Sequence, residues 1–346
     1  MQYQIKILLL SFAITVISSF IIIPILRKLK VGQMERAEGP ESHLGKQGTP
    51  TMGGIIMILV IMLLTSFMCY DYIKDEQAEV AQNIIPIAGL AVGFGLVGFI
   101  DDFKKLVLKN TKGLKPVYKI IGLLIFSVAF VLYITQILNI GTEIYMPFFK
   151  TYIILPIWLY IPFGILVLLA TSNAINLTDG IDGLATSVTA IILTCLTVIG
   201  IIFDIKEIVV FGSIVIGTCL GFLLFNLNPA KIFMGDSGSM FLGYIIAVIA
   251  LLGFKNITLT SFLVPMLLLA IPIMDTLFAI LRRLINHKPL GEPDKNHLHH
   301  QLLKLRLSQR KTVLIIYLVD ILFAIASILY AVGNKMLGTN KYGIII

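Results

Sequence analysis

The sequence predicts an all-α integral membrane protein with about ten transmembrane helices. The first reason is composition. Of the 346 residues, 58% are hydrophobic and 13% are charged, whereas soluble domains are about half apolar and about a quarter charged. The second reason is the mean hydropathy of +0.96. The third is a series of apolar runs that approach or exceed the roughly 20 residues needed to cross a bilayer.

The apolar runs follow one another without an internal repeat or a linker long enough for a second domain, so residues 1–346 are predicted to form one polytopic domain. The expected spans lie near residues 5–26, 51–70, 84–100, 117–138, 151–171, 184–203, 207–225, 238–254, 259–281 and 312–334. The first run lacks a small-residue cleavage pattern and is followed by Arg27 and Lys28, which predicts a retained span. Pro265 and Pro272 should bend or break the ninth, because each removes a backbone donor.

Lysine and arginine residues gather on alternate connections. Loops 27–50, 101–116, 226–237 and 282–311 carry 19 of the 27 Lys and Arg residues, and the opposite loops are short and acidic. The positive-inside rule makes the basic face cytoplasmic, so an even number of spans places both termini outside. The polar motifs and every histidine fall on or beside these cytoplasmic loops, which predicts a cytoplasmic active site. Because this asymmetry explains the net charge of +8, we do not expect a nucleic-acid partner.

The stretch TSNAINLTDGIDGL (171–184) is the densest polar motif. Asn173, Asn176, Asp179 and Asp182 recur every three residues, a spacing that places side chains on one face of a helical turn. So many amides and carboxylates beside membrane spans are costly unless they face water, a metal or a polar ligand. The motif therefore indicates a site rather than a plain loop.

Two acidic motifs lie at the ends of other spans. Asp101 and Asp102 close the third span, where carboxylates meet an unfavourable helix dipole and need a compensating partner; a solvated boundary is the alternative. In FNLNPAKIFMGDSGSMFLGY (225–244), Asp236 is a good oxygen ligand for Mg²⁺. Asp236 or Ser237 could equally cap the eighth helix, and both interpretations can hold together.

The histidines of HLHH (297–300) lie in the most basic loop, near Arg282 and Arg283. Imidazoles and cationic groups beside a Mg²⁺ site suit a pyrophosphate, with a patch for anionic lipid as the alternative. Zinc is not favoured, since the chain has no HExxH and no cysteine nearby. Inside the spans, the GxGxxG at 93–98 is predicted to serve helix packing. Asp275 and Asp320 are predicted to be paired or hydrogen-bonded structural groups, with an ion path as the alternative.

With these motifs in view, the chain resembles the polyprenyl-phosphate N-acetylhexosamine-1-phosphate transferases. The resemblance spans nearly the whole chain and rests on GTPTMGG (48–54), GFIDDFKK (98–105), NAINLTDGIDGLA (173–185), NPAKIFMGDSGS (228–239) and HLHH (297–300). It implies ten spans in a bacterial cytoplasmic membrane, a UDP-N-acetylhexosamine donor and undecaprenyl phosphate as acceptor. It also implies Mg²⁺, with Mn²⁺ as the alternative, and is compatible with a homodimer.

The resemblance further implies roles for individual residues. Asp236 would hold Mg²⁺ on the donor pyrophosphate. The catalytic group would comprise Asp101, Asp102, Asn176, Asp179, His297, His299 and His300. The substrate-binding group would comprise Lys46, Asn173, Asp182, Asn226, Phe233, Arg282 and Arg283, with Lys46, Asp182, Asn226 and Phe233 around the uridine. For Asp101 and Asp102 an orienting role is expected rather than a nucleophilic one, because a phosphate acceptor with a second pKa of about 6 is already mostly dianionic.

The two ends of the chain point to different donors. Residues 38–54 look like the phospho-MurNAc-pentapeptide translocases of peptidoglycan synthesis, whereas residues 272–303 look like the GlcNAc-1-phosphate enzymes. Because the second segment should meet the sugar, the expected function is GlcNAc-1-phosphate transfer from UDP-GlcNAc, the first membrane step of teichoic-acid or surface-polysaccharide synthesis. Phospho-MurNAc-pentapeptide transfer is the alternative. A transporter is a remote alternative, since it predicts polar groups near the bilayer midplane.

Overall fold

The computed structural model describes residues 2–29, 49–108, 113–139, 141–146, 151–253, 263–287 and 296–336. Within these ranges, nine helices are long and apolar enough to cross a membrane, which confirms the all-α membrane fold. They are α1 (Gln2–Lys28), α2 (Gly54–Lys74), α3 (Ala78–Leu106), α4 (Pro116–Leu132, continued by a π-helical turn to Ile137), α5 (Ile157–Thr178), α6 (Leu184–Ile202), α7 (Lys206–Asn226), α8 (Gly235–Gly253) and α12 (Gln309–Met336).

The ninth expected span is broken in the structure. Its described part forms two shorter helices, α9 (Leu263–Leu268) and α10 (Ala270–Ile285), which meet at Leu269. Pro272 has no N–H group with which to bond the Leu268 carbonyl, so the regular helical ladder is interrupted at this point. The prediction that prolines break this span is confirmed, while its expected start at residue 259 lies outside the described residues.

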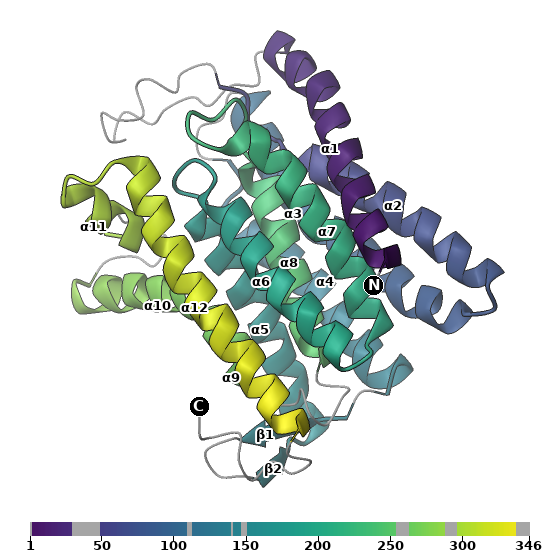
Figure 1. Ribbon diagram of the computed structural model, residues 1–346. Coiled ribbons are helices and arrows are strands. Elements are labelled where there is room, and N and C mark those ends of the chain that lie inside the picture. The colour runs from purple at the N-terminus through teal and green to yellow at the C-terminus, as the bar shows by residue number, and fades with distance from the viewer. Residues whose placement is uncertain are drawn as a thin grey trace.

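Helices α7 and α8 form the centre of the bundle (Figure 1). In each, 83% of the apolar stretch is buried, against 28% in α1. α8 packs against α2, α3, α5 and α6. On α1, Phe20 is 67% exposed and Ile21 is 60% exposed, as expected for side chains that face lipid. Apolar residues therefore fill the core of the bundle and also cover its perimeter.

A small hairpin precedes α5, and the sequence did not predict it. Strands β1 (Glu143–Met146) and β2 (Thr151–Ile154) pair antiparallel, with Glu143 opposite Ile154. The expectation that the fifth span begins at residue 151 is therefore wrong. β-Branched residues in 151–154 favour the strand, and α5 begins only after Pro156, whose fixed φ suits a helix start.

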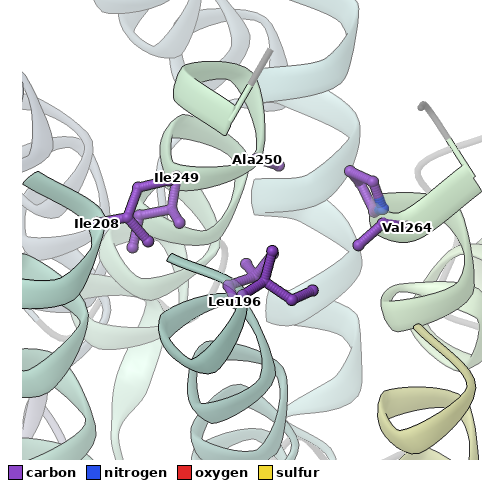
Figure 2. Close-up of a pocket in the computed structure, with 7 residues that line it drawn as sticks. Leu196, Ile208, Ile249, Ala250 and Val264 are labelled. Carbon is purple, nitrogen blue, oxygen red and sulfur yellow. The ribbon is translucent and has the colours of Figure 1, made fainter. Parts of the chain in front are cut away.

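The bundle has two unlike ends. The hairpin lies at the lower end of Figure 1, while α11 (Leu298–Lys304) lies at the upper left. A hollow between α6, α7, α8 and α9 (Figure 2) is lined entirely by apolar residues: Leu196, Ile199, Ile208, Ile249, Ala250, Val264 and Pro265. These residues lie near the opposite ends of α6, α7 and α8 from those that carry the predicted polar motifs, so the hollow is not the candidate site.

Candidate active site

Three carboxylates and two lysines form one cluster, here called the acid–lysine cluster: Asp101, Asp102, Lys105, Lys119 and Asp236. Lys105 Nζ lies 3.0 Å from Asp236 Oδ2 and also pairs with Asp101. Lys119 Nζ, from α4, lies 2.9 Å from Asp236 Oδ2 and 3.8 Å from Asp101 Oδ2. The cluster thus joins the last turns of α3, the first turn of α4 and the first turn of α8. Its two ammonium groups balance two of its three carboxylates.

Asp102 caps α8 from another helix. Its side chain accepts hydrogen bonds from the backbone N–H groups of Asp236 at 3.1 Å and Ser237 at 2.9 Å. Asp102 is only 4% exposed. The first N–H groups of a helix lack partners within the helix and favour a negative charge. The expected cap at the start of the eighth helix is therefore present, but it comes from α3 rather than from Asp236 or Ser237.

The start of α8 is in close contact with α2 and α3. A Cβ added at Gly98 would lie 2.2 Å from the Asp236 carbonyl oxygen, and one added at Gly54 would lie 2.1 Å from the Gly238 nitrogen. The interpretation of the GxGxxG glycines as helix-packing residues is thereby confirmed. In addition, the N–H of Phe233 donates to Pro50 O at 2.9 Å, and that of Gly53 donates to Phe233 O at 2.9 Å. The segment before α2 is thus fastened beside Asp236.

The polar array of residues 173–182 straddles the end of α5. Asn173 and Asn176 lie in the last turns of this helix, Asp179 is its C-cap residue, and Asp182 lies in the connection to α6. Ser239 of α8 donates to Asn176 Oδ1 at 3.1 Å. The array does not form a single helical face, because α5 ends at Thr178 and Asp182 lies beyond that end. Asn173 donates to the Leu169 carbonyl at 2.7 Å within α5.

Asp182 organises the connection between α7 and α8. Its Oδ2 accepts from the side chain of Asn228 at 2.9 Å and from the N–H of Ala230 at 3.2 Å. The Asn228 amide also lies 2.9 Å from Gln309 Oε1 at the start of α12. Asn226 is buried and holds the same connection, with its amide donating to Ile232 O at 2.9 Å. Two of the residues expected near the uridine therefore hold the loops in place.

The histidine motif forms the short helix α11 and its N-cap. Asp275 lies on α10, and its Oδ2 is 2.9 Å from His297 Nδ1. Its Oδ1 accepts a hydrogen bond from the N–H of Leu298 at 2.8 Å. His297 and His299 are buried and their rings are parallel. A Cβ added at Gly180 would lie 2.3 Å from His299 Nε2. Helix α11 therefore contacts α10 and the α5–α6 connection.

The two acids inside the last expected spans differ. The predicted hydrogen-bonded role of Asp275 is confirmed. Asp320 in α12 is 2% exposed, and neither of its carboxylate oxygens has a hydrogen-bond partner among the described residues. The predicted pairing of Asp320 is therefore not found, because this position of α12 presents the carboxylate to a buried interface that supplies no donor.

The remaining predicted residues in the described part of the chain are Phe233, Arg282 and Arg283. Phe233 is half-buried beside residues 50–53, and Arg282 and Arg283 are half-buried in the last turn of α10. Lys46 lies outside the described residues.

The sequence did not point to Lys105, Lys119 or Gln309 as site residues. Lys105 is four residues after Asp101, a spacing that favours a helical ion pair. For Lys119 we find no local signal, since its partner Asp236 is 117 residues away.

The acid–lysine cluster fits a hard divalent cation. Carboxylate oxygens of Asp101 and Asp236 converge on one place, and positively charged lysines occupy that place in this structure. Mg²⁺ is commonly held by one or two carboxylates, with phosphate and water completing its shell. Among the described residues, no three His, Cys, Asp or Glu side chains are arranged to hold a metal ion. Asp236 and Asp101, whose carboxylates both contact Lys105, are the two residues that would hold one here.

The fold and this cluster define a multi-pass membrane protein with a charged site at one end of its helices. Residues 84–254 match the model of glycosyl transferase family 4, and residues 46–58 match signature 1 of the phospho-N-acetylmuramoyl-pentapeptide-transferases.

Proteins named phospho-N-acetylmuramoyl-pentapeptide-transferase are similar over much or most of their length. The one from Halalkalibacterium halodurans is 38% identical over 93% of this chain and 95% of its own. That from Clostridium botulinum is 44% identical over 71% of this chain and 72% of its own. That from Acetivibrio thermocellus is 42% identical over 70% and 71%, respectively.

The chain therefore belongs to the polyprenyl-phosphate N-acetylhexosamine-1-phosphate transferase family. It is an enzyme of the glycosyl-1-phosphate transferase type, and the family implies a UDP-sugar and a polyprenyl phosphate carrier in the membrane. On the donor, the comparisons support the pentapeptide alternative better than the expected GlcNAc-1-phosphate. The matched signature overlaps residues 38–54, the segment that pointed to that alternative. This segment therefore predicted the donor better than residues 272–303, which include the histidine motif.

Proposed function

We propose that this protein transfers phospho-MurNAc-pentapeptide from its UDP-linked donor to undecaprenyl phosphate, releasing UMP. The observation that carries this proposal is the similarity to phospho-N-acetylmuramoyl-pentapeptide-transferases over 93% of the chain. The fold adds support, because the matched signature segment 46–58 includes Gly53, which is hydrogen-bonded to the loop that leads to Asp236.

In the proposed reaction, an oxygen of the lipid phosphate attacks the β-phosphorus of the donor. The bond from that phosphorus to the bridging oxygen breaks, and UMP leaves with the electron pair. Phosphoryl transfer of this kind depends mainly on positioning and on neutralising charge. The acceptor is mostly dianionic at neutral pH, so it needs no base to remove a proton. This favours an orienting role for Asp101 and Asp102.

The acid–lysine cluster would bind the phosphates. Lys105 and Lys119, which pair with Asp236 and Asp101 in this structure, would turn to phosphate oxygens when substrate enters. Asp236, with Asp101, would hold Mg²⁺ or Mn²⁺. The bound ion would supply positive charge to the donor pyrophosphate. Asp102 keeps the first turn of α8 in place through its two hydrogen bonds to backbone N–H groups.

The other motifs would bind the rest of the donor. The three histidines of the α11 segment would donate to oxygens of the leaving UMP as charge develops there. Asp182, Asn226, Phe233 and Lys46 would shape the uridine site, with Asn173 beside it and Arg282 and Arg283 at its cationic rim. Asn176 and Asp179 would shape the site near the metal. The bias of Lys and Arg toward these loops supports a site on the cytoplasmic face of the bacterial cytoplasmic membrane, with both termini outside.

The test is UMP release by purified protein in nanodiscs with undecaprenyl phosphate and Mg²⁺. UDP-MurNAc-pentapeptide and UDP-GlcNAc are supplied separately, and the lipid product is identified by mass. Asp236→Asn serves as the inactive control, and Asp204→Asn, at the opposite end of the bundle, as the matched neutral one. Release with the pentapeptide donor supports the proposal. Release with UDP-GlcNAc alone, or no release with either donor from protein that still unfolds cooperatively, overturns it.

A further inference from the structure

We infer that Asp275 is a positioning residue of the active site: its carboxylate fixes His297 as the Nδ1–H tautomer and sets α11 in place. The inference rests on the proposed function only for the statement that α11 faces the donor phosphates. The tautomer and the docking follow from the geometry alone.

The carboxylate of Asp275 contacts both the ring of His297 and the backbone of α11. Asp275 Oδ2 lies 2.9 Å from the ring of His297, and Oδ1 accepts from the backbone of Leu298 at 2.8 Å. The Asp275 and His297 side chains are 12% and 7% exposed, respectively. His297 is the N-cap residue of α11 but makes no capping hydrogen bond with its own side chain. Asp275 therefore replaces the missing cap while it holds the ring, so the backbone and the imidazole of α11 are fixed together.

The chemistry of the carboxylate determines the state of the ring. An ionised carboxylate only accepts hydrogen bonds, so the His297 nitrogen that faces it must carry a proton. The proton on Nδ1 leaves Nε2 as the atom available to other groups, as an acceptor in the neutral ring or a donor in the imidazolium. When the ring also carries a proton on Nε2, it can donate from that atom to a phosphate oxygen while the Nδ1–H keeps its bond to the carboxylate.

Helix α11 depends on such contacts for its position. It has seven residues, which is too short for an isolated helix to be stable in water. On its other side, the ring of His299 lies against Gly180, where an added Cβ would be 2.3 Å from Nε2. The His297 and His299 rings are parallel, with centroids 5.9 Å apart, and those of His299 and His300 are 4.2 Å apart. A change in the angle of His297 would therefore be passed to both neighbours.

The alternative is that His297 only neutralises a buried carboxylate and that Asp275 has no positioning role. The variant Asp275→Asn distinguishes this structural role from the positioning role. The carboxamide keeps the size of the side chain and can still accept from the N–H of Leu298. Its NH₂ group, however, would donate to His297 Nδ1 and would drive the ring to the Nε2–H tautomer. A purely structural contact tolerates this exchange, whereas a positioning role does not.

The first measurement is ¹⁵N NMR of histidine-labelled protein at a pH where the rings are neutral. The chain has only five histidines, and His297→Gln assigns the signal. We expect the Nδ1–H pattern for His297 in the wild type and the Nε2–H pattern in Asp275→Asn. An Nε2–H wild-type ring overturns the inference. This measurement needs no turnover, so it decides the tautomer even if the protein proves inactive with every donor tested.

The second measurement is the steady-state kinetics of the same variants. We expect Asp275→Asn to lower kcat roughly tenfold or more, with KM little changed, as for other carboxylates that orient a catalytic histidine. Asp275→Glu should restore part of kcat, and Asp275→Asn combined with His297→Gln should cost no more than His297→Gln alone. An unchanged kcat in an Asp275→Asn protein whose tautomer has flipped would overturn the positioning role.

Discussion

Asp102 accepts a hydrogen bond from the backbone N–H of Ser237 at 2.9 Å and so joins the end of α3 to the start of α8. The adjacent Asp101 instead pairs with the lysines and accepts from the N–H of Leu114 at 2.6 Å. These two consecutive carboxylates therefore have different roles. One holds the helix on which Asp236 lies, and the other shares the charged site with Asp236.

We expect Asp102→Asn to lower both stability and activity. The carboxamide has one acceptor oxygen for two N–H groups and no charge to set against the helix dipole, so the cost should be about 1–2 kcal/mol. Because Asp236 would shift with the start of α8, kcat should fall roughly tenfold. Thermal unfolding in detergent and UMP release measure the two effects. A fall in kcat without any loss of stability would instead indicate a direct chemical role for Asp102.

Lys119→Met should separate metal binding from turnover. Lys119 and Lys105 both contact Asp236 Oδ2, so they compete with a divalent cation for that oxygen. Removing Lys119 should lower the Mg²⁺ concentration needed for half-maximal activity, while kcat falls about tenfold or more because phosphate charge is less well neutralised. Lys104→Met, which lies on α3 next to Lys105 but outside these ion pairs, is the control. If the Mg²⁺ requirement rises, the competition does not exist.

Gly180→Ala should damage activity far more than stability. An added Cβ would lie 2.3 Å from His299 Nε2, so the ring must move. The displaced histidine should lower kcat about tenfold or more, whereas the thermal midpoint should change little because α11 lies at the edge of the bundle. The matched control is Gly89→Ala, where an added Cβ meets no atom within 4 Å. Equal activity of the two variants would show that the position of His299 is unimportant.

Asp320→Val should stabilise the protein. The carboxylate is buried in α12 without a hydrogen-bond partner among the described residues, and an unpartnered polar group costs roughly 1–3 kcal/mol in a protein interior. Its replacement by an apolar side chain of similar size should raise the thermal midpoint and leave UMP release unchanged. Asp320→Asn, which keeps the polar group, should gain less. Lower activity in Asp320→Val would reveal a function for this carboxylate.

Much of the fold could be predicted from local patterns. Apolar runs located the nine described candidate spans, and Pro265 and Pro272 marked the broken one. Boundaries were less accurate where polar residues continue a helix: α3 runs past Asp102 to Leu106, and α5 includes Asn176. Hydropathy falls at such residues even though the backbone stays helical, so the end of an apolar run is not the end of the helix. The hairpin at 143–154 was missed because its strands are four residues each.

Hydropathy and motif spacing are properties of short stretches of chain, so they were enough to predict a polytopic membrane protein and its candidate polar residues. How those residues combine depends on the packing of the helices. Lys119 meets Asp236 across 117 positions, Asp102 caps a helix 135 positions away, and Asp275 holds His297 from a different helix. Such pairs form because packed helices bring distant backbone and charged groups to one end of the bundle, and no local periodicity records which groups will meet there.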